Sequence, residues 1–585
     1  MIIPTEANTH FATFTIRVDG TDLPETVGVQ QIIVQKETNK IPTARITVYD
    51  GDVGSSDFVL SAGDLFKPGN TLEILGGYER EETLLFTGII ITHSIAIKGS
   101  ESSTLNVELR DAAVKMTVGR KNRYFAPDST DSDIIEELLG EYADLQPEVE
   151  ATDAVHQEMV QYFATDWDFM LSRAEVNGQL VFVDDGLVAV KKPAVDESPL
   201  ITLNYGQNIL EFEAAIDARD QLAATRTRAW DYATQELAET EGSDPGIDGA
   251  GNLAPDELAG VVGLEEWVLQ HPGLLPGQEL QAWSDATLMR SRLAKVRGRV
   301  KVIGYSEVKP GQMIELAGFG DRFNGNVFVS GVYHEFSPSN KWYTNIQFGL
   351  DRKWFAHRYD DILEKPAAGL LPAIQGLHQG VVTNIHEDPD GEGRVQVNIP
   401  IINPEDPGVW ARVARPDAGE GERARGVFFH PEIGDEVVVG FFNDDPRDPV
   451  ILGMLHSSAK PTPYEVTEDN HEKGIVTRGE LKFTFNDDTK VITLETPNGN
   501  KVVLSDEDGG VTLEDENGNT CILNSDGITL DSAADVTISA SGDITLSGTN
   551  VSQTANAEWK AEGSAGVELS SSATATLKGS LVQIN

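Results

Sequence analysis

The chain has 585 residues, 40% of them hydrophobic, and a formal net charge of −49 at pH 7. This length suffices for roughly three to five domains, and the acidic balance argues against nucleic acid and anionic membranes as binding partners. The single cysteine, Cys521, excludes an intrachain disulfide and fits folding in a reducing cytoplasm. No secretory signal is expected at the N-terminus, which lacks a basic segment followed by an apolar core.

Residues 1–365 are predicted to be rich in β-strands with helical inserts. Residues 11–20 and 43–51 alternate apolar and polar side chains and end in a glycine, as half-buried strands do. Residues 71–99 have the pattern of a hairpin of two long strands. This part of the chain is therefore expected to be built mainly from sheets.

Two helices are predicted within this region. The first lies in residues 129–145, where apolar side chains share one face and Thr130 or Asp131 can cap the start. The second lies in residues 165–178 and ends at Gly178. These two segments are the helical inserts that the sequence indicates most clearly.

The composition changes at three later points. Residues 240–280 are rich in glycine, proline and acidic side chains, and we expect a mostly irregular insertion there. Residues 366–375 contain two prolines and are predicted to be a linker. Residues 376–460 contain five or six short strands, which suits a small β-barrel.

The remaining residues, 461–585, contain a repeat. Between Gly527 and Gly548, pairs of apolar residues recur every eight positions. Less regular pairs precede them, and the last of these is expected to be Ile522 with Leu523. The residues predicted to point inward are Ile528, Leu530, Val536, Ile538, Ile544, Leu546, Val567, Leu569 and Leu577.

An eight-residue repeat supplies one strand and a turn, with two side chains on the inner face. Two side chains cannot enclose a core, and single-chain solenoids use coils of roughly 20 residues or more. Three identical chains, each forming one wall of a triangular prism, would close the core without a long open edge. We therefore expect a homotrimer with a stiff needle, and a single-chain solenoid with irregular coils is the alternative.

The register after Leu546 is open. An unbroken repeat turns Ser552 and Thr554 inward, whereas a seven-residue step selects Val551 and Gln553. The second register is preferred because it also aligns the later apolar residues. In that register three Gln553 side chains would surround the axis.

Three stretches of the predicted barrel resemble the OB-fold domain of VgrG proteins and phage cell-puncturing spikes. They are GRVQVNIP at 393–400, WARVARP at 410–416, and residues 430–455. Upstream, residues 161–182 and 308–351 resemble the hub of the same family. The C-terminal repeat resembles the β-helix of these spikes. The hub, the barrel and the repeat occur in the family's order and cover most of the chain, apart from the expected insertion.

The resemblance implies a mainly β fold: a hub of two tube-like β-barrel domains with helical inserts, an OB-fold barrel, and a C-terminal triple-stranded β-helix. It also implies a function, as the trimeric central spike of a contractile injection system. Relatives serve type VI secretion, phage-tail-like extracellular particles and contractile phages. The protein would be made in the bacterial cytoplasm without a signal peptide, assembled into the baseplate, and expelled on firing.

The resemblance also implies partners. The hub would bind inner tube and baseplate proteins, and the needle would touch the target membrane only transiently while it punctures the envelope. A PAAR-type tip protein and effector cargo are further expected partners. We expect the tip protein to sit on the last strand, which comprises Leu581, Val582, Gln583, Ile584 and Asn585.

No catalytic, cofactor or metal site is predicted. The barrel leads directly into the repeat, which leaves no room for a lysozyme domain with two carboxylates in a cleft. The histidines are not paired at the spacing that metal ligands have on a helix or in a tight loop. We therefore expect a structural protein and no enzyme. The alternatives are a trimeric phage tailspike enzyme, which would need a wide carboxylate-lined groove, and a receptor-binding adhesin.

Overall fold

The computed structural model describes residues 11–99, 103–247, 249–263, 265–337, 341–420 and 424–584. It divides into two compact units. The first unit comprises Met1–Ile374 with Asn443–Pro446, and the second comprises Gln375–Phe442 with Arg447–Asn585. No helix among the described residues is both long and apolar enough to span a bilayer.

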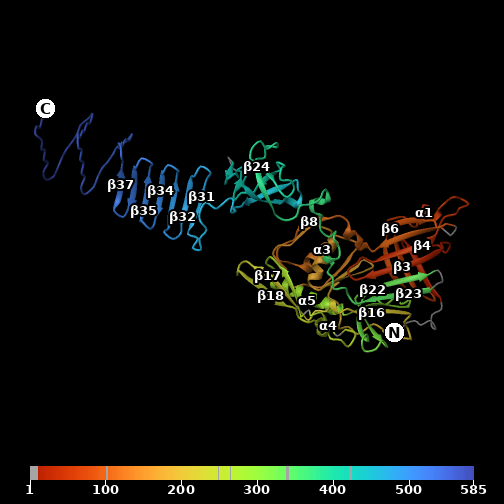
Figure 1. Ribbon diagram of the computed structural model, residues 1–585. Coiled ribbons are helices and arrows are strands. Elements are labelled where there is room, and N and C mark those ends of the chain that lie inside the picture. Colours follow the sequence, from red (N-terminus) through yellow and green to blue (C-terminus); the bar gives the residue numbers. More distant parts are fainter. Residues whose placement is uncertain are drawn as a thin grey trace. The chain divides into compact units, whose positions relative to one another are not determined.

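A single 13-stranded sheet organises the first unit (Figure 1). Its hydrogen-bonded order is β16 (Glu211–Ile216), β20 (Val296–Ile303), β23 (Lys341–Phe348), β22 (Gly325–Ser337), β3 (Val29–Glu37), β4 (Thr43–Tyr49), β7 (Thr104–Arg110), β6 (Glu81–Ala96), β5 (Thr71–Tyr78), β1 (Ala12–Val18) and β2 (Thr21–Asp22). Two short strands, β15 (Thr202–Asn204) and β21 (Met313–Ala317), pair with each other, and β21 also pairs with β22.

The sheet joins two parts of the chain that are far apart in sequence. Strand β22 pairs with β3, so that Glu335 lies opposite Ile33, and Gln31 donates a hydrogen bond to Glu335 at 2.8 Å. Two separate hydrophobic cores pack on the sheet, one from its N-terminal strands and one from its later strands. The described strands of the two halves thus form one continuous hydrogen-bonded sheet.

The predicted hairpin and the two predicted helices are confirmed. Strands β5 and β6 are joined by Glu79 and Arg80, whose positive φ angles of 52° and 68° match a tight hairpin turn. Helix α2 (Asp131–Gly140) begins with a capping box in which Thr130 accepts from the backbone of Asp133. Helix α3 (Asp166–Val176) is capped by Thr165.

The other helical segments of the described chain are shorter or were not predicted. They are α1 (Val59–Ala62), α4 (Pro255–Val262), α5 (Gly277–Leu293), and the 3₁₀ turns η1 (Ala112–Thr117), η2 (Ala218–Asp220), η3 (Phe355–His357), η4 (Pro366–Gly369) and η5 (Phe442–Asp444). Four small sheets accompany them: β9 (Ser129–Thr130) with β11 (Val155–His156); β8 (Lys121–Tyr124) with β12 (Val160–Ala164); β10 (Gln146–Val149), β14 (Leu187–Lys191) and β13 (Leu180–Asp184); and β18 (Glu236–Glu241), β17 (Ala224–Asp231) and β19 (Glu266–His271).

The expectation of a mostly irregular insertion at residues 240–280 is corrected by two of these elements. Helix α4 starts with Pro255 and stops at Gly263, which has a left-handed φ of 70°. Strand β19 pairs in parallel with β17. The glycine and proline residues therefore mark the ends of regular elements, and the pairing of β19 could not be read locally because its partner lies some 40 residues away.

The second unit begins with a closed five-stranded barrel. Its strands, in order around the barrel, are β24 (His378–Asn384), β25 (Val395–Asn398), β26 (Val409–Val413), β30 (Pro449–Met454) and β29 (Glu436–Phe441), and the short hairpin β27 (Ala418–Gly419) and β28 (Arg425–Gly426) accompanies them. Alternate valine and isoleucine side chains fill its interior.

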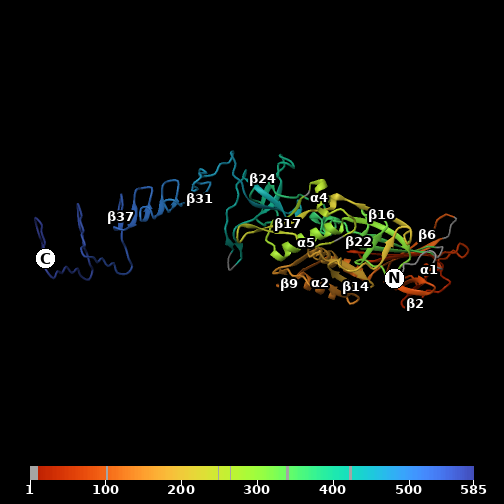
Figure 2. The same cartoon turned by 90° about the horizontal axis from the view of Figure 1, so that it is seen from below.

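A seven-stranded antiparallel sheet follows the barrel. Its strands are β31 (Glu472–Val476), β32 (Lys482–Asn486), β33 (Val491–Glu495), β34 (Lys501–Ser505), β35 (Gly510–Glu514), β36 (Thr520–Asn524) and β37 (Gly527–Asp531). Figures 1 and 2 show these strands as successive rungs of one layer, with a chain that carries no strand arrows after them. Each strand pairs with the next one of the same chain, and β37, which holds the first eight-residue repeat, pairs with β36.

Candidate functional site: the apolar face of the C-terminal sheet

Two rows of apolar side chains cross one side of the seven-stranded sheet. Side chains that lie opposite each other on paired strands share a face. The strand register places one row along Phe483, Leu494, Val502, Leu513, Cys521 and Leu530, and a second row along Phe485, Ile492, Leu504, Val511, Leu523 and Ile528. We call these twelve residues the apolar face.

The apolar face corrects one predicted pair. Ile522 and Leu523 are adjacent, and adjacent residues of a strand point to opposite sides of the sheet. The register puts Ile522 opposite Thr512, on the other side, and makes Cys521 the partner of Leu523 on the apolar face. The alternation of side chains along the strand could have indicated Cys521 as the partner of Leu523, because cysteine behaves as a small apolar residue.

The opposite side of the sheet is polar. Its centre is a row of six β-branched residues, four of them threonines: Thr484, Thr493, Val503, Thr512, Ile522 and Thr529. Cross-strand ion pairs flank this row, since Lys501 lies 2.7 Å from Glu514 and Lys482 lies 3.5 Å from Glu495. Threonine and paired charges suit a face that stays in water.

No described segment of the chain covers the apolar face. Leu494, Leu504 and Leu513 are 48%, 45% and 43% exposed, and Leu530 on the last strand is 63% exposed. A groove of about 660 Å³ runs over the first row. An exposed apolar surface of this regularity marks an interaction site rather than a solvated surface.

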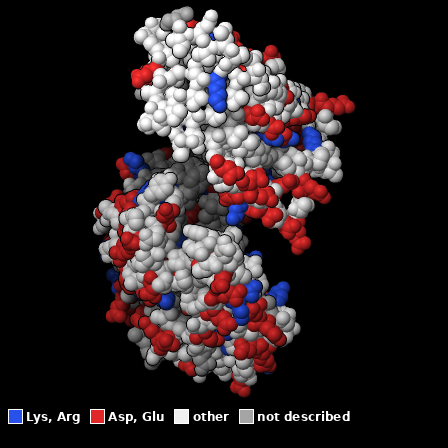
Figure 3. Space-filling view, turned by 90° about the vertical axis from the view of Figure 1, so that its left-hand side faces the viewer, with Lys and Arg blue, Asp and Glu red and all other residues white. Residues whose placement is uncertain are grey.

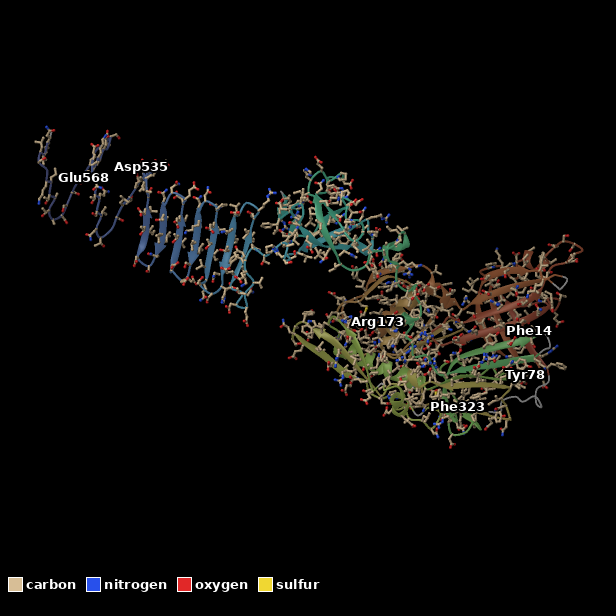
Figure 4. The ribbon with its side chains drawn as sticks, viewed as in Figure 1. Phe14, Tyr78, Arg173, Phe323, Asp535 and Glu568 are labelled. Atoms are coloured by element: carbon tan, nitrogen blue, oxygen red, sulfur yellow. The ribbon has the colours of Figure 1, made fainter. Side chains whose placement is uncertain are left out.

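Beyond Asp531 the repeat continues without strands in the single chain. Residues 532–584 are described throughout and contain no strand, and Figure 4 labels Asp535 and Glu568 on this part. The predicted inward residues here are all exposed in the single chain: Val536, Ile538, Ile544, Leu546, Val567, Leu569 and Leu577. Their inward orientation stays a prediction, because it depends on a neighbouring copy.

The residues whose register is open and the predicted tip seat also lie after Asp531, in what we call the extension. Trp559 donates a hydrogen bond from Nε1 to Oε1 of Gln553 at 3.0 Å, which brings these two side chains together but does not distinguish the two registers. In the predicted tip seat, Leu581, Val582 and Ile584 are exposed, by 90% for Ile584, and so is Gln583. Asn585 lies outside the described residues.

Two asparagines connect successive turns along one edge of the sheet. Each closes an Asn-Gly-Asn sequence. The Oδ1 atom of Asn500 accepts a bond from the backbone of Glu516 at 3.2 Å, and that of Asn519 accepts bonds from Ser532 Oγ at 2.7 Å and the backbone of Ala533 at 3.0 Å. These bonds set the spacing between turns that are 13 to 16 residues apart.

A buried charged cluster in the first unit is the strongest competing candidate for a site. Arg173 on α3, labelled in Figure 4, lies 2.6 Å from Asp131 and 2.7 Å from Glu279 on α5. His156 lies 3.1 Å from Asp131. Burial alone would raise the pKa of the Asp131 carboxyl, but hydrogen bonds from His156 and Arg173 lower it well below its ordinary value.

The arrangement of this cluster favours a structural role. All four side chains are buried or nearly so, and each bonds to another member of the cluster. They join α2, β11, α3 and α5 to one another. Among the described residues, no three His, Cys, Asp or Glu side chains are grouped to hold a metal ion.

Residues 388–393 of the barrel, DPDGEG, resemble part of a calcium-binding loop, but other groups of the chain already bond to the Asp388 carboxylate. The Asp388 carboxylate accepts bonds from the backbone of Glu392 at 2.9 Å and from Arg394 Nη2 at 2.6 Å. The hydrogen bonds from Arg394 lower the pKa of Asp388 below its ordinary value. Arg394 thus occupies the place where a cation would sit.

The chain matches three family models. Residues 8–338 match the Alg8 N-terminal domain. Residues 378–456 match the type VI secretion system/phage-baseplate injector OB domain, and residues 491–557 match the phage baseplate V C-terminal trimerisation domain. The last match covers five strands of the seven-stranded sheet and continues into the extension beyond it.

Similar proteins include spike proteins of type VI secretion systems. VgrG4b of Pseudomonas aeruginosa is 31% identical over 129 residues, which are 21% of this chain and 16% of the relative. VgrG1a of the same organism is 26% identical over 220 residues, which are 35% of this chain and 33% of the relative. The matched part thus spans a third or less of the length of these relatives.

A solved structure similar to this one is the tail protein from Neisseria meningitidis MC58. The match has a TM-score of 0.45 at 15% identity and covers 59% of this chain and 98% of that chain.

Proposed function

This chain belongs to the family of the Alg8 N-terminal domain and is a VgrG-like spike protein, and from that premise we propose that three copies of it form the central spike of a contractile injection system. In this proposal the role is mechanical and not catalytic. The first unit joins the inner tube and baseplate, and the C-terminal repeat forms the needle that punctures the target envelope.

The observation that carries the proposal is the exposed apolar face. Its two rows hold phenylalanine, leucine, isoleucine and valine at every strand from β32 to β37, apart from Cys521. A single layer cannot bury such a face. Three copies related by a three-fold axis bury it by turning the three faces toward the axis, with the threonine rows outside.

The needle has two zones that differ in whether the strand backbone is paired within the chain. Up to Asp531 the strand backbone groups are paired within the chain. In residues 532–584 no strand pairing occurs within the chain, although the apolar pairs continue. Buried backbone groups require partners, so in the assembled needle the other two copies supply them to this second zone.

Such a needle suits puncturing because it has paired strands and a shared core and presents no long free edge. In the assembled particle its end would hold a tip protein of the PAAR type, and effectors would travel with the spike. Acidic side chains outnumber basic ones on the surface in Figure 3. This charge would limit adhesion to anionic lipid while the needle passes through a membrane.

The mass of the purified full-length protein tests the assembly. We expect light scattering to give three times the 63.5 kDa of the chain. The Leu494→Lys variant places a charge on the apolar face and should be monomeric, whereas Thr493→Lys places the same charge one residue away on the polar face and should stay trimeric. A monomeric wild-type protein, or equal behaviour of the two variants, would contradict the proposal.

The role in injection needs a second measurement. In cells that lack their own copy of the gene, Thr493→Lys should restore assembled particles that carry a central spike, as seen by electron microscopy, and Leu494→Lys should not. Particles that assemble and inject normally with Leu494→Lys would show that injection does not depend on the core of the needle.

A further inference from the structure

The chain leaves the sheet of the first unit along a segment that is firmly bonded. After β23, residues 351–362 run without strands past α3 and α5, which lie against each other. We call these residues the strap. They include the single turn η3, and they lead to the end of the first unit at Ile374.

A buried ion pair holds the strap by its backbone. Arg290 on α5 and Glu175 on α3 are 4% and 3% exposed, and their Nη1 and Oε1 atoms are 2.6 Å apart. The other guanidinium nitrogen of Arg290, Nη2, donates to the carbonyls of Asp351 at 3.2 Å and Lys353 at 2.9 Å. The second carboxylate oxygen of Glu175 accepts the amide of Phe355 at 2.6 Å.

The far end of the strap has its own anchor. Arg120 donates to the carbonyl of Ile362 at 3.1 Å and also to that of Asp361. Phe355 and Ile362 are each 9% exposed and join the hydrophobic core that α2 and α3 share. The strap is thus bonded at both ends and packed by two side chains between them.

This use of charge is costly and specific. A buried ion pair must compensate the loss of hydration of both groups, and it does so only if the remaining donors and acceptors find partners. Here Nη2 of Arg290 donates to two backbone carbonyls of an irregular segment and Glu175 accepts from one of its amides, while Nε of Arg290 is buried without a hydrogen-bond partner among the described residues. The pair therefore binds the strap at the same time as it joins the two helices.

We propose that the Glu175–Arg290 pair is a mechanical clamp that fixes the point where the chain leaves the first unit. A force that reaches Ile362 along the chain is resisted by the strap and by α3 and α5, and reaches β23 of the large sheet only after the strap has detached. This inference rests on the proposed function, because only a spike that is driven through an envelope transmits such a force.

Detachment of the strap can be measured on the full-length protein. The Phe355 amide reports the clamp directly, and trypsin can cut after Lys353, which is exposed although its carbonyl accepts a bond from Arg290. In a Glu175→Leu/Arg290→Met double variant we expect Phe355 to exchange and the strap to be cut roughly 10- to 100-fold faster, as the loss of hydrogen bonds to charged groups implies. Removing both charges avoids an unpaired buried ion.

Two controls separate the clamp from general stability. The pair Arg299–Glu213 has a similar separation of 2.9 Å but is 72% and 73% exposed, so Glu213→Leu/Arg299→Met should leave both rates unchanged. If the buried double variant does not fold, Arg290→Lys keeps the charge, loses the fork, and should still speed cutting after Lys353. Wild-type rates in every folded clamp variant would overturn the proposal, whatever the mass of the protein.

The mechanical part is tested by pulling single full-length molecules between the first unit and the C-terminus. A segment of 351–362 spans at most about 40 Å when it is drawn straight, so detachment should lengthen the molecule by less than that. We expect this step at a lower force in the clamp variants than in the wild type. A step at the same force would show that the clamp carries no load, even if the protein is trimeric and puncturing occurs.

Discussion

The change Leu504→Ala gives the sharpest test of how the needle core closes. Leu504 lies at the centre of the apolar face and is 45% exposed in the single chain. If nothing covered it, about half of the burial free energy of a leucine would be at stake, or roughly 1 kcal/mol. If two other copies bury it, truncation also leaves a cavity and costs about 2–5 kcal/mol per chain.

The neighbouring residue provides the control. Val503 precedes Leu504 on β34 and points to the polar side, opposite Thr493 and Thr512. Val503→Ala should therefore cost about 1 kcal/mol or less per chain. Because each trimer contains three copies, the Leu504→Ala variant should lose about 6–15 kcal/mol per trimer relative to its constituents.

Guanidinium unfolding of the full-length protein at several concentrations measures this difference, because the midpoint of a trimer depends on its concentration. We expect a large fall in the midpoint of the needle transition for Leu504→Ala and a small one for Val503→Ala. Equal midpoints for the two variants would refute the reasoning, since they would mean that both faces of the sheet remain in water.

Smaller effects are expected at three other positions. Asn519→Ala removes the side chain that accepts hydrogen bonds from the next turn, and it should lower the stability of the needle by about 1 kcal/mol per chain. Asn517→Ala should cost less, because the Asn517 side chain bonds only within its own turn. Equal guanidinium midpoints for the two variants would count against the bridging role of Asn519. Thr130→Ala breaks the capping box of α2 and should cost about 0.5–2 kcal/mol, seen as a lower Tm of the first unit; an unchanged Tm would argue against it. Burial, aided by the charge of Lys36, lowers the pKa of His334 to about 3. The unfolded chain binds this proton near pH 6.5, so the first unit should lose stability as the pH falls from about 6.5 towards 3, and a His334→Gln variant should lose less over that range; parallel Tm profiles would disprove this.

Local patterns were sufficient for several elements. Helices α2 and α3 carry a threonine cap and an apolar stripe within a few residues, and the hairpin of β5 and β6 follows from alternation and a tight turn. The repeat after Gly527 indicates one apolar side per strand, because the side-chain period of a strand is two. Each of these signals lies within one turn or one strand of the element that it specifies.

Helix α5 was missed because its signals are weak. It starts after Pro276 without a capping side chain, and its buried surface includes Ser284, Arg290 and Ser291 along with apolar residues. These polar residues are bonded by β17, the loop near Gln221, Glu175 on α3, and the strap. Periodicity of hydrophobic residues cannot reveal a helix whose buried contacts are hydrogen bonds to distant segments.

The amino-acid sequence alone thus determined the hairpin of β5 and β6, the caps of α2 and α3, and the alternation that gives the needle an apolar side, since these depend on neighbours close along the chain. Only the tertiary structure decided that β22 pairs with β3 in one continuous sheet, and that Arg290 meets Glu175 and the strap. Those contacts join residues more than 60 positions apart. Their stability comes from burying charge and backbone together, which no short stretch of sequence can show.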